Sequence, residues 1–429
     1  MISIQDIVAD RERIEQALAK RVEGIDFTEV IGWHQHRKAR KADADELRNR
    51  RKTLSAKIPA MMKSGEDASE VKERVKQIAA EVGEAEAAHA ELDRKIHDFL
   101  VYLPNVPEDE VPAGGKENNQ PLAHYRDKPA FDFAIRDHVE LATGLGLIDY
   151  ERGVKIGGRG KWLYWGDGAL LEWGLINYFV DHHRKNGYTF VLPPHLLRLE
   201  SGYVAGQFPK FQDDVFYVTS RAGGEELTHF LLPTAETALA NLFVDEVIPE
   251  ERLPLKMFGY TPCYRREAGS YRTAERGTIR GNQFNKVEIF AIARPQESEE
   301  VFQEIVGRAT ALVEGLGLHF RVTRLAAGDC SEGMAKTYDV EVWLPSIGDY
   351  KEVSSVSTAH TFQAIRGNVK YRDAATKKNR YVHTLNGSGL ATSRLLPAIL
   401  EQNQRADGSV AVPEVLRPWV GKAVFEPVS

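Results

Sequence analysis

Apolar residues in the first quarter of the chain recur with the spacing of a coiled-coil helix. From Val71 to Leu103 they alternate at intervals of four and three residues, and only His89 interrupts the series. A seam kept over more than four heptads predicts a long helix that packs against a partner helix. At His89, a seam position, we expect a buried or half-buried structural histidine rather than a ligand.

A second helix that can pair with this seam is predicted just upstream, at about 27–58, where apolar residues again share one face. Pro59 should break or kink this helix, because proline lacks the amide hydrogen that a helix interior needs. The glycine-containing segment Lys63–Ser69 indicates a turn, and Ser64 or Ser69 could cap the returning helix. Two helices joined by so short a turn are expected to pack as an antiparallel hairpin.

The two predicted helices differ in charge. Residues 34–63 carry ten Lys and Arg against three Asp and Glu, whereas residues 66–98 carry ten acidic residues against five basic ones. One interpretation is a solvated coiled coil with complementary helices. The other is a projecting arm whose basic helix follows an RNA backbone, since RNA is recognised largely through phosphate and shape. Both interpretations place a coiled coil at about 27–100 within an N-terminal helical arm, residues 1–105.

The composition changes after this arm. Residues 104–121 are rich in Pro, Gly, Asn and acidic residues, which indicates a linker, placed here at 106–124. In residues 125–429, short β-like runs alternate with helical segments, and most runs lack the intervening helix that parallel strands require. We therefore expect an α+β domain with an antiparallel sheet and helices packed on it. The strands are expected at Trp162–Trp165, Thr189–Leu192, Val215–Val218, Lys286–Ala293, Asp339–Leu344 and Tyr350–Ser355, and the helices at Leu170–His183, Glu236–Val244 and Glu297–Glu314.

Composition narrows the class of protein further. The 429 residues allow two domains, and no stretch approaches the roughly 20 apolar residues of a membrane span, so no membrane association is expected. The N-terminus is charged from its sixth residue and has no apolar signal core, which favours a cytoplasmic location. Two isolated cysteines, Cys263 and Cys330, argue against a disulfide framework and a zinc ribbon. With a net charge of −6, binding to nucleic acid would depend on local basic density.

The block Tyr264–Glu288 carries the clearest candidate chemistry. Read as two strands around the polar loop Ala268–Gly277, it places Arg265 and Glu267 on one face of the first strand. Such a surface suits a nucleotide, with a phenyl ring for a base and arginines for phosphates, but a surface hairpin with paired charges would share the pattern. The alternating side chains of the second strand are Arg280, Asn282, Phe284, Lys286 and Glu288.

This block resembles motif 2 of class II aminoacyl-tRNA synthetases in its seryl form, which is FRxEAG, ten residues, and then RxHQFxKVE. Four other segments resemble further signatures of bacterial-type seryl-tRNA synthetases, in the same order and over essentially the whole chain. They are GYTFVLPPHLL at 187–197, with motif 1 around Pro194; LLPTAE at 231–236; AKTYDVEVWLP at 335–345 with YKEVSS at 350–355; and NGSGLATSR of motif 3 at 386–394. The resemblance implies a class II catalytic domain at 125–429 and a tRNA-binding arm at 1–105.

The resemblance also implies an activity. Members of this family activate L-serine with ATP to seryl-adenylate and transfer the seryl group to the 3′ end of tRNA(Ser), as homodimers. The implied serine-binding residues are Thr234, Ala235, Glu236, Arg265, Glu288, Asn386 and Ser388. The implied ATP-binding residues are Arg265, Arg266, Glu267, Arg280, Phe284, Glu352, Val353, Ser354, Ser355 and Arg394. Arg265, Arg280 and Arg394 would be catalytic, and Glu352 and Ser355 would bind Mg²⁺, with no zinc.

Three segments depart from the family pattern. The usual SNCEDFQARR is STAHTFQAIR at Ser357–Arg366, the histidine of HQF is Asn282, and the AVGR of motif 3 is ATSR at Ala391–Arg394. None of these changes removes a residue with an implied role. They leave open a specialised paralogue, which would serve antibiotic resistance or a biosynthetic pathway, and a non-catalytic RNA-binding paralogue.

Overall fold

The computed structural model describes residues 1–222, 225–267 and 276–428. The chain forms two compact units, Ile2–Leu103 and Pro104–Ser429, the second of which also includes Met1. No described helix combines the length and the apolar run that a bilayer crossing needs.

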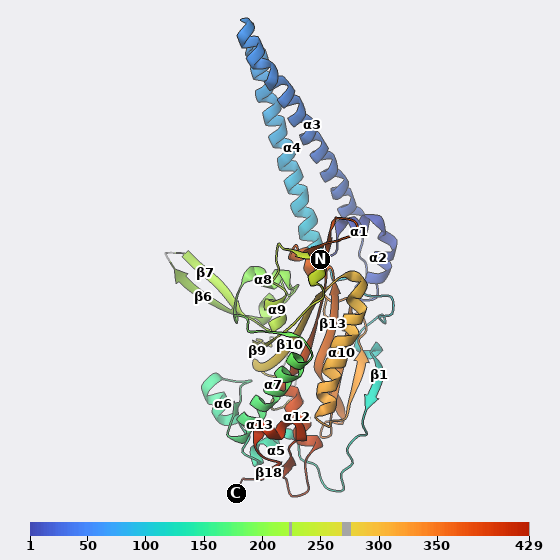
Figure 1. Ribbon diagram of the computed structural model, residues 1–429, viewed down its shortest axis with the longest axis vertical. Coiled ribbons are helices and arrows are strands. Elements are labelled where there is room, and N and C mark those ends of the chain that lie inside the picture. Colours follow the sequence, from blue (N-terminus) through green and yellow to red (C-terminus); the bar gives the residue numbers. More distant parts are fainter. Residues whose placement is uncertain (223–224, 268–275, 429) are drawn as a thin grey trace. The chain divides into compact units, whose positions relative to one another are not determined.

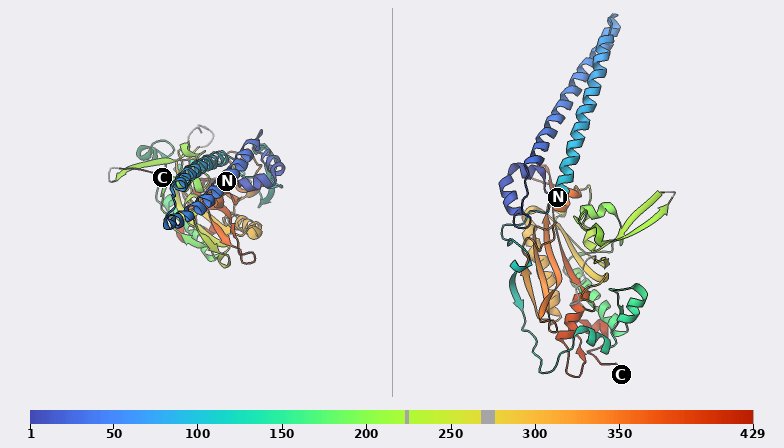
Figure 2. Two further views of the ribbon diagram at one scale, coloured as in Figure 1. Left: turned by 90° about the horizontal axis from the view of Figure 1, so that it is seen from above. Right: turned by 180° about the vertical axis from the view of Figure 1, so that it is seen from behind.

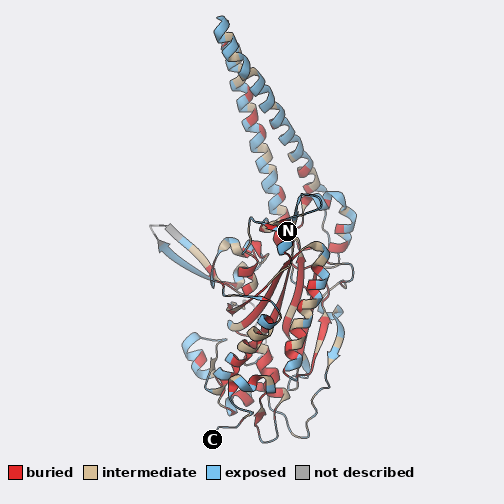
Figure 3. Cartoon of the chain, in the orientation of Figure 1, coloured by how far each residue is buried: buried red, intermediate tan, exposed pale blue. Residues whose placement is uncertain are grey.

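The first unit is built around two long helices that lie side by side (Figure 1; Figure 2, right). The predicted antiparallel pair is confirmed, because α3 and α4 pack along their lengths. On α4 the predicted seam is the buried stripe, with Ile78, Val82 and Ile96 buried and His89 half-buried. The remaining surface of both helices is largely exposed (Figure 3). The helices of this unit are α1 (Ile4–Ala9), α2 (Arg11–Leu18), α3 (Thr28–Ser64) and α4 (Ser69–Val101).

The turn of this hairpin differs from expectation in two respects, since Pro59 does not break α3 and no serine caps α4. Helix α3 continues through Pro59 and ends at Ser64, followed by Gly65 in the left-handed conformation at φ 79°. Proline removes one helical hydrogen bond, but most helical stability in proteins comes from packing, and α3 packs along α4. Neither predicted serine caps α4; instead the Asp67 carboxylate accepts a hydrogen bond from the amide of Ser69 (2.9 Å).

The second unit is organised by one large sheet. In the part of the chain that the structure describes, this sheet has eight strands in the order β1-β11-β12-β13-β16-β10-β9-β4, and only β4 pairs in parallel. The α+β class with an antiparallel sheet is thereby confirmed. The strands are β1 (Gln120–Tyr125), β4 (Thr189–Val191), β9 (Leu255–Tyr264), β10 (Gln283–Ala293), β11 (Phe320–Arg324), β12 (Lys336–Leu344), β13 (Asp349–His360) and β16 (His383–Ala391).

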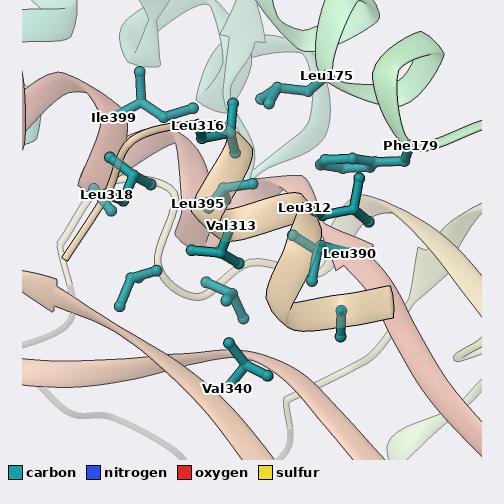
Figure 4. Close-up of a cluster of buried hydrophobic side chains, with 14 of the residues drawn as sticks. Leu175, Phe179, Leu312, Val313, Leu316, Leu318, Val340, Leu390, Leu395 and Ile399 are labelled. Atoms are coloured by element: carbon teal, nitrogen blue, oxygen red, sulfur yellow. The ribbon is translucent and has the colours of Figure 1, made fainter. Parts of the chain in front are cut away.

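Three helices cover one face of this sheet: α7 (Asp167–Lys185), α10 (Ser298–Gly315) and α12 (Thr392–Gln402). The alternate apolar residues of the central strands point into this layer and form the main core with the helices (Figures 3 and 4). In Figure 4, Leu312 and Val313 of α10 lie near Phe179 of α7 and Val340 of β12. Burial of so much apolar surface is the main stabilising term of this unit.

Smaller elements surround the sheet. A second core packs α9 (Ala235–Leu239), α11 (Phe362–Arg366) and β8 (Val247–Pro249) around Met257 and Phe290. The remaining helices are α5 (His138–Gly144), α6 (Tyr150–Gly157), α8 (Leu199–Val204) and α13 (Arg417–Val420). The remaining strands are β2 (Ile148–Asp149), β3 (Leu163–Tyr164), β5 (Leu196–Arg198), β6 (Phe216–Ala222), β7 (Glu225–Leu231), β14 (Lys370–Arg372), β15 (Asn379–Tyr381), β17 (Val410–Ala411) and β18 (Val424–Phe425).

The segment interpreted as a linker, 106–124, differs from that interpretation. It belongs to the second unit, and its end forms β1, the edge strand that pairs with β11. The amides of Ala327 and Gly328 donate hydrogen bonds to carbonyls within the segment (both 2.8 Å). Proline and glycine suit such an edge as well as a linker, because an edge strand tolerates a residue without an amide hydrogen.

Candidate active site on the polar face of the sheet

The face of the large sheet opposite the three helices gathers polar side chains. Residues directly opposite each other in antiparallel strands project to the same face, so the register defines the group. Three such pairs share this face: Glu288 with Ser388, Asp339 with Ser355, and Glu341 with Glu352. Residues that lie far apart in sequence are thereby brought onto one surface.

A β-bulge in β13 places Glu352 and Ser355 on the same face. Residues three apart in a regular strand point to opposite faces. The pairing with β12 shifts by one residue here, because Val340 opposes Ser354 and Glu341 opposes Glu352. The extra residue, Val353, is buried. The bulge thus makes the expected metal-binding pair geometrically feasible.

Val353 and Ser354 do not share this polar face. Val353 packs in the main core, and the buried Ser354 hydroxyl donates a hydrogen bond to the carbonyl of Ser388 (2.6 Å). Their side chains therefore hold β13 in place. The contact with ATP that the resemblance implies for Val353 and Ser354 would therefore be made by their backbone atoms.

The hairpin of β9 and β10 carries the residues of the motif 2-like block, but its strands are shorter than predicted. β9 ends at Tyr264 and β10 begins at Gln283, so Arg265, Glu267 and Arg280 lie in the connection, where strand alternation does not apply. Residues 268–275 of the expected loop lie outside the described residues.

Asn282 closes this connection. Its side-chain amide donates hydrogen bonds to the carbonyls of Arg265 (3.1 Å) and Arg266 (3.0 Å). Its own carbonyl accepts from the amide of Arg265 (2.9 Å). These bonds continue the hairpin beyond its last strand pair, and Arg280 extends it through an ion pair with Glu267 (2.6 Å).

Arg265 and Arg394 approach the site from separate segments. The Arg265 guanidinium lies over the ring of Phe284, 5.2 Å from its centroid, and its Nε donates to the carbonyl of Pro233 (3.2 Å). Arg394, in the first turn of α12, donates to the Glu352 carboxylate (3.0 Å). A planar guanidinium is suited to bridging two anionic groups. Arg266 differs, because it donates to the carbonyl of Asp213 (3.1 Å) outside this group.

A second group of residues forms around the N-terminus of α9. Thr234 is the N-cap, and its hydroxyl accepts hydrogen bonds from the amide of Glu236 (3.3 Å) and from Nζ of the buried Lys286 (2.7 Å). Lys286 also forms an ion pair with the buried Glu288. Ala235 is buried beside these residues. The structure thus joins the expected serine-binding residues of α9 to those of β10.

The electrostatics of Glu236 are unusual. Burial, and then the charge of Glu288, raise the pKa of Glu236 to about 7. Lys286 and hydrogen bonds from Gln363 and Asn386 oppose this rise. A carboxyl group whose pKa lies near neutrality, beside a second carboxylate, is a site that a cation would stabilise.

The carboxylates of β12 and β13 form a coupled pair. Burial, and then the charge of Glu352, raise the pKa of Asp339 well above its ordinary value. Burial also opposes the ionisation of Glu352, but Arg394 and Arg265 outweigh it and lower the pKa of that carboxyl. Glu352 is therefore the ionised member of the pair at neutral pH. Ser355 donates a hydrogen bond to Asp339 (2.6 Å).

The donor set at this point fits magnesium. Within the described residues, no three His, Cys, Asp or Glu side chains come together in a group that could hold a metal ion. Magnesium usually takes only one or two carboxylates from the protein and completes its shell with phosphates and water. An ionised Glu352 beside the Ser355 hydroxyl matches this limited requirement.

Sequence reasoning missed one residue of this site. Gln363 lies in the divergent segment Ser357–Arg366, and its side-chain amide donates a hydrogen bond to the Glu236 carboxylate (2.8 Å). No local pattern places a residue of α11 next to α9, because the contact depends on the tertiary fold. Lys286 was expected on the polar face, but its bond to Thr234 was not foreseen.

This fold and this site define a class II aminoacyl-tRNA synthetase. Residues 217–403 match the tRNA synthetase class II core domain (G, H, P, S and T), and residues 1–107 match the Seryl-tRNA synthetase N-terminal domain. The chain belongs to the seryl-tRNA synthetase family.

Individual relatives agree with this assignment. The chain is 51% identical to Serine--tRNA ligase 2 of Clostridium acetobutylicum, over 98% of this chain and 99% of that protein. It is 40% identical to Serine--tRNA ligase of Desulforapulum autotrophicum, over 98% of both chains. The crystal structure of seryl-tRNA synthetase from Pyrococcus horikoshii complexed with ATP has a TM-score of 0.91 at 31% identity, with both chains fully covered. These relatives support the aminoacylating interpretation and not the specialised or non-catalytic alternatives.

The raised pKa of Asp339 predicts a pH-dependent stability difference. A carboxyl with a raised folded-state pKa binds its proton more tightly in the folded protein, so its contribution to stability is lost as pH rises through that pKa. Asp339→Asn keeps an oxygen for the Ser355 hydroxyl and removes this loss. We expect the variant to raise the melting temperature by several degrees at pH 8 and by less at pH 5, as measured by calorimetry.

The exposed Asp127 provides a control. Asp127→Asn should leave the melting temperature nearly unchanged at both pH values. An equal shift for Asp339→Asn at pH 5 and pH 8 would contradict the assignment of the raised pKa to this carboxyl.

Proposed function

We propose that this chain activates L-serine with ATP to form seryl-adenylate and transfers the seryl group to the 3′ end of tRNA(Ser). One observation carries the proposal: the arginine–phenylalanine pair of the hairpin and the carboxylates around α9 are joined through β10, which supplies both Phe284 and Glu288. A site for a nucleotide and a site for an amino acid therefore lie on one strand. The similarity to a synthetase complexed with ATP agrees with this division.

The adenylation step needs positioning and charge cancellation more than proton transfer. The serine carboxylate is ionised at neutral pH, so it can attack the α-phosphorus of ATP in line and displace pyrophosphate. Arg265 would bridge the serine carboxylate and the α-phosphate, and Phe284 would stack on adenine. Arg280 and Arg394 would hold the γ-phosphate, and Glu267 would contact the adenine amino group. Holding both reactants in this alignment accounts for much of the expected rate gain.

The carboxylates around α9 suit the ammonium and hydroxyl groups of serine. Glu236, whose pKa is about 7, would pair with the serine ammonium, which would favour its ionised form. Glu288 and Ser388 would recognise the hydroxyl, with Asn386 beside them. A buried polar group built for a hydroxyl is left unpaired by alanine, so this site should reject alanine strongly.

Magnesium belongs to this proposal as the partner of ATP. Glu352 and Ser355 would hold the ion, and Arg394 fixes the orientation of Glu352. When bound, magnesium supplies positive charge that offsets the charge of the phosphates. The lowered pKa of Glu352 keeps a negative ligand available at neutral pH.

We place the reaction in the cytoplasm. Cys263 and Cys330 are both buried cysteines, which is compatible with a reducing compartment.

Replacing Arg265 tests the adenylation site. Arg265→Ala removes the group expected to bridge the two anions, so serine-dependent ATP–pyrophosphate exchange should fall by about 10³-fold or more. Arg405→Ala, which changes an exposed arginine after α12, should leave the exchange rate unchanged. Near-normal exchange by Arg265→Ala would refute its role, and exchange driven equally by glycine or alanine would refute the specificity for serine.

The N-terminal unit is proposed to bind tRNA through the basic surface of α3. Ion pairs with α4 engage Arg37 and Arg48, while Arg50 and Arg51 are exposed. A rod with exposed cations along one helix suits the phosphate backbone of a folded RNA.

Deletion of residues 30–98 should separate serine activation from tRNA charging. Because these residues fall within a unit distinct from the sheet, exchange with serine and ATP should persist within about twofold. Charging of tRNA should fall by about 10²-fold or more, since its phosphate contacts are lost. Substituting only Arg50 and Arg51 with Glu should weaken charging in the same direction. Equal loss of exchange and charging in the deletion variant would mean that the arm is structural.

A homodimer completes the proposal. The motif 1-like segment includes β4, which packs against α7, and the two elements expose large apolar side chains. These are Leu170 and Trp173 of α7, Phe190 of β4, and Leu192, of which 71% is exposed. A cluster of exposed apolar residues is typical of a protein interface.

Light scattering tests this interface. The native chain should have the mass of a dimer, and Leu192→Asp combined with Trp173→Asp should have that of a monomer, because charges in an apolar interface are costly. Ile156→Asp, at an even more exposed apolar residue of α6, should leave the dimer intact. A monomeric native chain would contradict the proposal.

A further inference from the structure

The buried Gln363 has every polar group of its side chain engaged. Its amide nitrogen donates to the Glu236 carboxylate (2.8 Å) and to the carbonyl of Ala205 (3.0 Å). Its amide oxygen accepts a hydrogen bond from the hydroxyl of Thr384 on β16 (2.7 Å). The side chain thereby connects α11, α9 and β16, three elements that meet beside the amino-acid end of the site.

These partners determine which way the amide points. If the amide were turned over, its oxygen would face the Glu236 carboxylate and the carbonyl of Ala205, both of which are acceptors. The Thr384 hydroxyl would then face an N–H group instead of the amide oxygen. The two acceptors, Glu236 and the carbonyl of Ala205, therefore set the orientation in which an N–H group reaches Glu236, and the Thr384 hydroxyl anchors the amide oxygen in it.

Such a donor has a definite electrostatic effect. A hydrogen bond to a carboxylate favours its ionised form. Burial and Glu288 work against ionisation of Glu236, whereas Lys286, Gln363 and Asn386 favour it.

Two other titratable groups near α9 have little effect on the charge balance at Glu236. Burial raises the pKa of the Cys263 thiol on β9, which keeps it neutral, and Glu200 of α8 is exposed. Gln363 is thus one of a small set of groups that shift the balance at Glu236.

We infer that Gln363, anchored by Thr384, is a positioning residue that keeps Glu236 ionised and aimed at the ammonium group of the amino-acid substrate. The inference rests on the proposed function, in which Glu236 binds the serine ammonium. Gln363 itself need not touch serine. Its removal should therefore affect serine binding and its pH dependence, and should leave ATP binding intact.

The test is the pH dependence of serine-dependent ATP–pyrophosphate exchange with the full-length protein. Gln363→Leu keeps the volume of the side chain and removes the donor. We expect the KM for serine to rise about tenfold, because hydrogen bonds to charged groups are among the stronger ones. The KM for ATP should stay unchanged. The acid limb of kcat/KM for serine should move upward by about one pH unit, since the pKa of Glu236 rises without the donor.

Two further variants sharpen the result. Thr384→Val removes the hydroxyl that anchors the amide oxygen, at nearly constant shape, and should shift the acid limb in the same direction by a smaller amount; if Gln363→Leu fails to fold, this variant decides. Gln303→Leu removes an exposed glutamine of α10 and should match the native profile.

The possible outcomes separate the inference from the proposed function. A native chain without serine-dependent exchange at any pH would overturn the proposed function. A native chain with normal exchange, together with an unmoved acid limb in Gln363→Leu, would overturn the role of Gln363 alone. A shift in Gln363→Leu but not in Thr384→Val would overturn the anchoring role of Thr384.

Discussion

The alternation of side chains across one antiparallel sheet underlies every other feature of the catalytic unit. One face is apolar and is sealed by α7, α10 and α12, and this burial supplies the stability of the unit. The other face can then hold carboxylates and cations that would weaken a core. Pairing between neighbouring strands fixes which of these residues lie opposite each other. Charges far apart in sequence are therefore held at defined separations without a ligand to organise them.

The same arrangement explains how closely spaced charges are tolerated. Asp339 and Glu352 would repel each other if both were ionised, and the arginine at the start of α12 resolves this by favouring ionisation of Glu352. Lys286 forms an ion pair with Glu288 on the same strand, β10. At Glu352 the cation comes from α12 and the carboxylate from β13, so packing of this helix and preparation of the site are linked.

Much of this architecture could be predicted from the sequence, for physical reasons that differ between elements. The heptad spacing of α4 identified its buried stripe, because a helix repeats its face every seven residues. The polar face of β10 followed from period-two alternation from Phe284 onward. Roles within the site required the family resemblance, because alternation alone also fitted a surface hairpin.

The remaining features were not predictable because they depend on partners that are distant in sequence. The bulge at Val353 is visible only in the register with β12, and the reach of Gln363 to Glu236 depends on the packing of α11 beside α9. Helix α3 continues through Pro59 because packing along the partner helix outweighs a local preference. Strand ends were also misplaced, since Asn282 sustains the hairpin with side-chain bonds where alternation has already stopped.

Thr234 has two structural roles, and these restrict how the residue can change during evolution. One hydroxyl both begins a helix and anchors the lysine that neutralises its neighbour, so a replacement there would disturb folding and recognition together. An enzyme that evolves to recognise another amino acid would therefore keep threonine at this position. Change is easier at residues with a single role, so a new amino-acid preference should first be sought among the residues that β16 and α11 contribute to the site.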